Sequence, residues 1–76
     1  MEQITKLSKL VASPFRQEIE LEHIDHEAGF ITLRVKIRER GRFTIFDIDA
    51  QTAAQWGRAM LEWSEAQSGE ELKSAG

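Results

Sequence analysis

The two histidines and their acidic neighbours are the side chains in this sequence that could most readily bind a metal or transfer a proton. The histidines are His23 and His26, and three acidic residues lie beside them: Glu22, Asp25 and Glu27. Imidazole and carboxylate groups are common zinc ligands. The spacing opposes a preformed site, because a helical metal pair needs three or four residues on one helix face, and this segment alternates like a strand. We interpret the cluster as a solvated polar turn and expect no metal site.

Other catalytic groups are missing from the sequence. The chain has no cysteine, which excludes disulfides, thiolate zinc sites and cysteine nucleophiles. Its internal glycines stand singly, so there is no glycine-rich loop that could hold a phosphate. Without a nucleophile paired to a base, the sequence predicts no catalytic residue, no cofactor and no enzymatic activity.

A run of basic residues in the middle of the chain could contact nucleic acid. It comprises Arg34, Lys36, Arg38, Arg40 and Arg42, with Phe43 and Phe46 close behind. Basic and aromatic side chains on neighbouring strands suit a β-ribbon or a stacking platform. The formal net charge of -3 and the acidic residues expected across from the run argue against it, because a nucleic-acid site normally shows as an uncompensated basic patch. Nucleic-acid binding is therefore the alternative function.

Three alternating runs between Arg16 and Asp49 predict an antiparallel β-meander that positions these side chains. In the first run Ile19 and Leu21 alternate with glutamates, and in the second an apolar residue occupies every odd position from 31 to 37. A period of two is typical of strands. The runs are separated by two turn signals that end in glycine.

The lengths of the two turns predict the register of the sheet. A five-residue loop over 25–29 places Ile24 opposite Phe30, and a three-residue turn over 39–41 places Ile37 opposite Phe43. One face of the sheet is then apolar and comprises Ile19, Leu21, Leu33, Val35, Ile37, Phe43 and Ile45. The other face carries cross-strand ion pairs and has an apolar end formed by Phe30, Phe46 and Ile48.

The N-terminal segment has apolar residues at helical spacing. Ile4, Leu7 and Leu10 recur three apart, which predicts a short amphipathic helix over 2–11. Pro14 ends this segment, because proline restrains the residue before it to extended geometry. The alternative is an irregular arm laid across a partner.

The C-terminal segment predicts a longer helix. Asp49 is a suitable N-cap, since its carboxylate can accept hydrogen bonds from the first backbone amides, and we expect the helix to run to about Gln67. A broad apolar face follows the three-four-three spacing of Ala53, Trp56, Met60 and Trp63. This face should pack on the apolar face of the sheet. Residues 69–76 are polar and without periodicity, so we expect a flexible tail.

Together these elements predict one small α+β domain over 1–68: a three-stranded antiparallel β-meander, a C-terminal helix packed on one face and a short N-terminal helix. With 76 residues, of which 41% are hydrophobic and 30% charged, the chain is near the lower size limit for a self-sufficient core. It has no long apolar run and no signal-peptide pattern, so we expect a cytoplasmic protein that does not contact membranes.

A small core without disulfides or metal favours self-association. We therefore expect a protein-interaction or accessory module that forms a homodimer or binds another protein. Contiguous apolar side chains that one subunit cannot cover usually mark an interface. The expected interface residues are Phe30, Phe46, Ile48 and Trp63.

Overall fold

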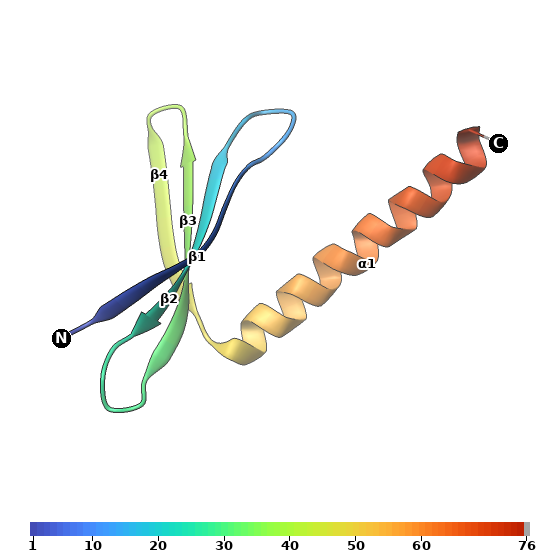
Figure 1. The fold of residues 1–76 in the computed structure, drawn as a ribbon. Helices are drawn as coiled ribbons and strands as arrows, with labels where there is room; N and C mark the ends of the chain where they lie inside the picture. The colour runs from blue at the N-terminus through green and yellow to red at the C-terminus, as the bar shows by residue number, and fades with distance from the viewer. Residues whose placement is uncertain (76) are drawn as a thin grey trace.

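A four-stranded sheet followed by one helix makes up the chain (Figure 1). The computed structural model describes the backbone of residues 1–75 and the side chains of residues 1–67. The elements are β1 (Gln3–Val11), β2 (Glu18–Asp25), β3 (Ile31–Glu39), β4 (Arg42–Ile48) and α1 (Ala50–Ala75). The strands pair antiparallel in the order β1-β2-β3-β4. The predicted α+β class and meander are confirmed, but the meander has four strands rather than three.

The predicted N-terminal helix is wrong, because residues 3–11 form the edge strand β1. Ile4 pairs with Ile24, and beyond a register shift at Leu7 the residue Ser8 pairs with Leu21. Such a bulge adds one residue to one strand and interrupts its alternation. The three-residue spacing of apolar side chains in this segment comes from the bulge rather than from a helical turn.

The loop between β2 and β3 has the predicted length but lies one residue further along the chain. It spans residues 26–30 instead of 25–29, which moves the pairing of β3 by two residues. Leu21 therefore lies opposite Val35 rather than Leu33. Because the displacement is even, the side chains of β2 and β3 stay on their predicted faces.

The turn between β3 and β4 has two residues rather than the predicted three. Its glycine, Gly41, has a φ of 66°, a left-handed conformation that side chains with a Cβ rarely adopt. The pairing of β4 is thereby displaced by one residue, and an odd displacement exchanges the two faces of a strand. Phe43 and Ile45, predicted in the core, lie on the face away from α1. Phe46 and Ile48 lie on the face toward it.

The start of α1 confirms the predicted cap. The carboxylate oxygen Oδ1 of Asp49 accepts a hydrogen bond of 2.9 Å from the backbone N–H of Thr52. Hydrogen bonding to Thr52 also lowers the pKa of Asp49 below its ordinary value. In the structure α1 extends beyond the predicted end near Gln67. The predicted flexible tail, residues 69–76, lies outside the residues whose side chains are described.

The helix α1 packs loosely on the sheet and leaves a gap between them. From its start beside β4 the helix runs away from the sheet (Figure 1), and it contacts β3. Among the described residues, the buried apolar side chains are Ile24 and Val35. The chain exposes 6419 Å², whereas a compact 8.7 kDa protein exposes about 4700 Å². Its radius of gyration is 15.7 Å, against about 11 Å for a compact chain of this length.

Burial in the sheet can be tested on one cross-strand pair. Ile24 is fully buried, whereas its partner Ile4 on β1 is 52% exposed. We predict that Ile24→Val lowers the free energy of unfolding by about 1 kcal/mol, and that Ile4→Val, the matched control, changes it by less than about 0.5 kcal/mol. Urea denaturation measures both. Equal losses from the two variants would contradict the placement of this pair.

Candidate functional site

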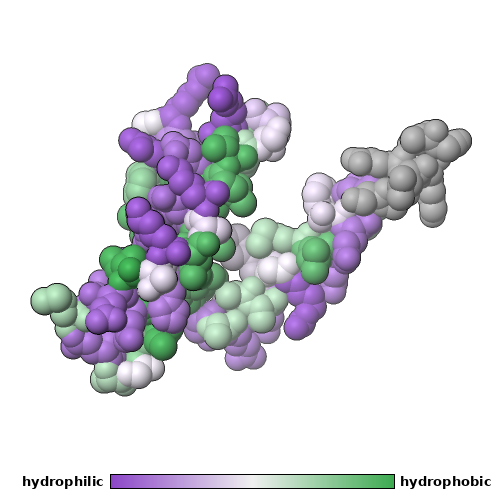
Figure 2. Space-filling model, in the orientation of Figure 1, coloured by the Kyte–Doolittle hydropathy of each residue, from purple (hydrophilic) through white to green (hydrophobic). Residues whose placement is uncertain are grey.

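An apolar groove lies between the sheet and α1. Its volume is about 330 Å³, and all four strands contribute side chains to its floor. The helix contributes Ala53, Trp56, Gly57 and Met60. Figure 2 shows apolar residues of the sheet facing the helix across this hollow.

The helix covers the groove incompletely. The ring of Trp56 lies 6.0 Å from that of Phe46 on β4, measured between centroids, yet Trp56 is still 42% exposed. Further along the same stripe, Met60 is 53% and Trp63 is 68% exposed. Large apolar side chains are normally buried when a surface is available to them. The groove and the stripe therefore form one apolar surface that a single chain leaves open.

The expected interface residues are distributed differently from the prediction. Phe46 and Ile48 lie on the face toward α1 rather than opposite it. Phe30 is 61% exposed and lies in the loop between β2 and β3, where its ring centroid is 4.9 Å from that of His26. Trp63 lies on the exposed stripe of α1. The structure thus joins Phe46, Ile48 and the helix into one surface and separates Phe30 from it.

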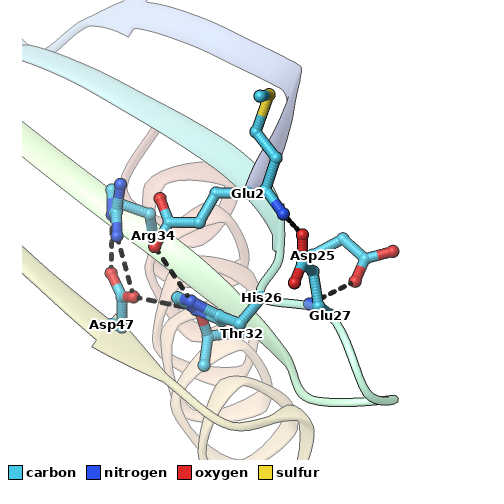
Figure 3. A network of polar contacts seen from close by, with 8 residues as sticks. Glu2, Asp25, His26, Glu27, Thr32, Arg34 and Asp47 are labelled. Carbon is cyan, nitrogen blue, oxygen red and sulfur yellow. Dashed lines mark hydrogen bonds and ion pairs between the residues drawn. The ribbon is translucent and has the colours of Figure 1, made fainter.

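On the other face of the sheet, a bidentate ion pair links β3 to β4 (Figure 3). Nε of Arg34 donates to Oδ1 of Asp47 over 2.8 Å, and Nη2 donates to Oδ2 over 3.2 Å. The hydrogen bond from Arg34 is the main cause that lowers the pKa of Asp47 below its ordinary value, and the same bond raises the pKa of Arg34. Planar two-point pairs of this kind are among the stronger charged interactions in proteins.

The same network extends to the loop and the N-terminus. The hydroxyl of Thr32 donates to Oδ2 of Asp47 over 3.0 Å, and its oxygen lies 2.8 Å from Nε2 of His26. Nδ1 of His26 lies 3.2 Å from a carboxylate oxygen of Glu2 (Figure 3). Both ring nitrogens are thus engaged in structural contacts.

The two histidines do not form a joint site. His23 lies opposite Leu33 within the sheet, whereas His26 lies in the loop and belongs to the polar network. In the described part of the chain, no three histidine, aspartate or glutamate side chains gather in an arrangement that could hold a metal ion.

Ion pairs neutralise the first part of the predicted basic run but not the rest. Arg34 is paired with Asp47, and Nζ of Lys36 lies 3.4 Å from a carboxylate oxygen of Glu22 and 3.8 Å from one of Glu20. Residues 38, 40 and 42 make no ion pair with any carboxylate whose side chain is described. The uncompensated charge therefore lies at the turn between β3 and β4.

Sequence reasoning missed Asp47 as a site residue. The predicted register placed Phe46 beside Arg34, but the shorter turn brings Asp47 to that position. The available signal was the alternation of Asp47 with Phe46 and Ile48, which suits a strand with the aspartate on its polar face.

Comparison with known proteins gives the family of this chain but no activity. A family of unknown function, DUF6967, matches residues 1–66, so the chain belongs to that family. The matched range contains the whole sheet and most of α1. No curated protein and no solved structure matches the chain. A further finding is that no helix in the described residues is long and apolar enough to cross a membrane.

The ion pair of Asp47 predicts a loss of stability in acid. The hydrogen bond from Arg34 lowers the pKa of Asp47 in the folded protein below its ordinary value. The stabilisation is therefore complete above about pH 5, and it is lost as the pH falls through the unfolded-state pKa toward the folded one. Asp47→Asn removes this ionisation. Between about pH 5 and pH 2, its free energy of unfolding should therefore fall less steeply than that of the wild type.

Urea denaturation at several pH values measures this difference. Arg34→Gln is the control, because it removes the partner that lowers the pKa of Asp47 and should flatten the profile in the same way. Wild-type and variant profiles that run parallel would contradict the role of the pair.

Proposed function

We propose that this protein is a homodimeric interaction module in which a second copy covers the apolar groove between the sheet and α1. One observation carries the proposal: Trp56, Met60 and Trp63 continue an apolar stripe along α1, but they are 42%, 53% and 68% exposed. The sheet beside them offers an apolar groove of about 330 Å³. Both halves of a hydrophobic contact are therefore present in one chain, and they meet only in part.

The surface area supports an interface of ordinary size. The chain exposes 6419 Å², which is roughly 1700 Å² more than a compact chain of its mass. A stable protein–protein interface buries about 800 Å² on each partner. A dimer that covers half of the excess on each protomer would reach this size.

A second copy of the chain is the occupant that fits best. The open groove requires an apolar helical stripe, and the uncovered part of α1 is such a stripe. In a two-fold dimer the same patch occurs on both subunits, so α1 of each protomer can pack against the groove of the other. Aromatic side chains and methionine suit the centre of such an interface.

We further propose that the module acts in the cytoplasm as an accessory protein without catalytic activity of its own. The chain has no cysteine and therefore none of the disulfides that stabilise many small secreted domains. The polar side chains that could serve in catalysis, His26, Asp47 and Arg34, are hydrogen-bonded within the network between the sheet and its loop.

Sedimentation equilibrium with substitutions on α1 tests the dimer. We expect the wild type at tens of micromolar to sediment with twice the monomer mass of 8.7 kDa. Trp63→Glu should weaken dimerisation by about 30-fold or more, because it places a charge at a central aromatic contact. Gln55→Glu adds the same charge to the polar side of α1 and should leave the dimer intact.

Two results would overturn the proposal. A wild type that sediments at 8.7 kDa at these concentrations would exclude the dimer, and equal dimerisation of both variants would exclude this surface. Circular dichroism checks the fold of Trp63→Glu, whose substituted side chain is 68% exposed in the protomer.

Thermal unfolding should depend on protein concentration if folding and dimerisation are coupled. A subunit that binds the folded state stabilises it by mass action. We predict that the melting temperature rises when the concentration increases from about 1 to 100 micromolar, as mass action requires. Trp63→Glu should lose this dependence, and Gln55→Glu should keep it. A wild-type melting temperature that is independent of concentration would contradict the coupling.

A further inference from the structure

A second cleft lies at the end of the sheet that carries the turns β1–β2 and β3–β4. Both connections are at the end opposite the start of α1 (Figure 1). The cleft has a volume of about 650 Å³ and is open to solvent. Its lining includes Phe15, Arg16 and Gln17 from the first connection, Arg40 from the second and Arg42 from the start of β4. Residues distant in sequence are therefore brought to one site that is separate from the apolar groove.

The charge of this site is strongly positive. Arg16, Arg40 and Arg42 line it, and Arg38 is on the adjoining strand. Within the described side chains, none of these guanidinium groups is in an ion pair. The carboxylate in the lining, that of Glu39, accepts a hydrogen bond of 3.3 Å from the side-chain amide of Gln17. Three arginines thus share the lining with one carboxylate, although the whole chain has a net charge of -3.

The first connection is held in shape by its backbone. The N–H of Ala12 donates to the carbonyl of Gln17 over 2.7 Å, and the N–H of Arg16 donates to the carbonyl of Ala12 over 2.8 Å. Arg16 has a φ of 62°, a left-handed conformation that is unfavourable for a residue with a Cβ. The loop therefore holds the backbone of Arg16 beside Arg40 and Arg42. The side chain of Arg16 makes no ion pair with another described side chain.

Two exposed phenylalanines accompany the arginines. Phe15 is 79% exposed in the lining of the cleft, and Phe43 is 54% exposed on β4 opposite Arg38. Neither side chain contributes a buried contact to the groove side of the sheet. Exposed aromatic rings beside basic side chains are the combination with which proteins bind single-stranded nucleic acids, because every base has a face that can stack. An acidic peptide would use the arginines but not the rings.

We propose that this cleft binds single-stranded nucleic acid, with the arginines contacting phosphates and Phe15 stacking on a base. The site differs from a strand-centred basic surface, since Arg34 and Lys36 are neutralised by Asp47, Glu20 and Glu22. It is also independent of the dimer, because the apolar groove contains no residue of the cleft. A two-fold dimer would carry two such sites.

Fluorescence anisotropy of the full-length protein tests the site. The probes are fluorescein-labelled oligo-dT and oligo-U of about 15 nucleotides, a size suited to one or two stacking sites, and a duplex of equal length. Both single strands should bind more tightly than the duplex. With three or four phosphates contacted, the logarithm of the affinity should fall with the logarithm of the salt concentration with a slope of about -2 to -3.

Three substitutions separate the contributions. Arg16→Gly removes the guanidinium and suits a φ of 62°, so it should weaken binding and flatten the salt slope without lowering stability. Phe15→Ser should weaken binding by about fivefold or more through loss of stacking. Arg58→Glu on α1 is the control. It lies on an exposed helix position away from the cleft and should leave the affinity nearly unchanged.

The binding assay, the substitutions and a competition with polyphosphate can each overturn the proposal. Absence of binding at low salt and about 100 micromolar protein would exclude affinities in the range of ordinary non-specific contacts. Equal loss of affinity in Arg58→Glu and Arg16→Gly would show general charge attraction rather than a site. If inorganic polyphosphate displaced oligo-dT with equal efficiency per phosphate and Phe15→Ser had no effect, the ligand would be a simple polyanion and not a nucleic acid.

Discussion

The structure depends on one incomplete hydrophobic contact, because α1 covers only part of the apolar face of the sheet. The first turns of the helix bring Ala53, Trp56, Gly57 and Met60 to the groove, after which the helix runs away from the sheet (Figure 1). Among the described residues, Ile24 and Val35 alone are buried apolar side chains, and Ile24 lies on the opposite face, across from Thr32. Burial of an apolar side chain contributes roughly 1.5 to 3 kcal/mol, so such a core stabilises a chain of this size weakly. A partner that closes the groove therefore contributes to folding and to assembly at once.

On the opposite face of the sheet, ion pairs connect neighbouring strands. The pair between Arg34 and Asp47 joins β3 to β4, and Lys36 lies between Glu20 and Glu22 of β2. These pairs also fix register, since a one-residue slip would bring the charged side chains to the groove side. As a consequence, the charge available for external ligands is concentrated at the end of the sheet that carries Arg16, Arg40 and Arg42.

Much of the architecture could be predicted from alternation, whereas the details depended on single residues. The strands around Leu21, Val35 and Ile45 and the cap at Asp49 were predictable, because period two and N-cap chemistry are local signals. The bulge at Leu7 was not, since an added residue makes a strand resemble a helix.

The faces of β4 were predicted wrongly because they depend on the length of one turn. A two-residue and a three-residue turn are both compatible with Gly41, yet they place opposite side chains against α1. The cleft at the other end could not be predicted, because it combines Phe15 and Arg16 with Arg40 through the pairing of β1, a strand that the helical prediction omitted.

The emission spectrum of the two tryptophans tests most directly whether a second copy covers the groove. Trp56 and Trp63 are the only tryptophans of the chain, and both lie on the stripe that the dimer would bury. A dimer that covers this groove predicts blue-shifted emission at tens of micromolar and a red shift on dilution, as the rings of the separated protomers become exposed to water. Emission that does not change with concentration, over a range in which sedimentation shows dissociation, would contradict the claim that a second copy covers this groove.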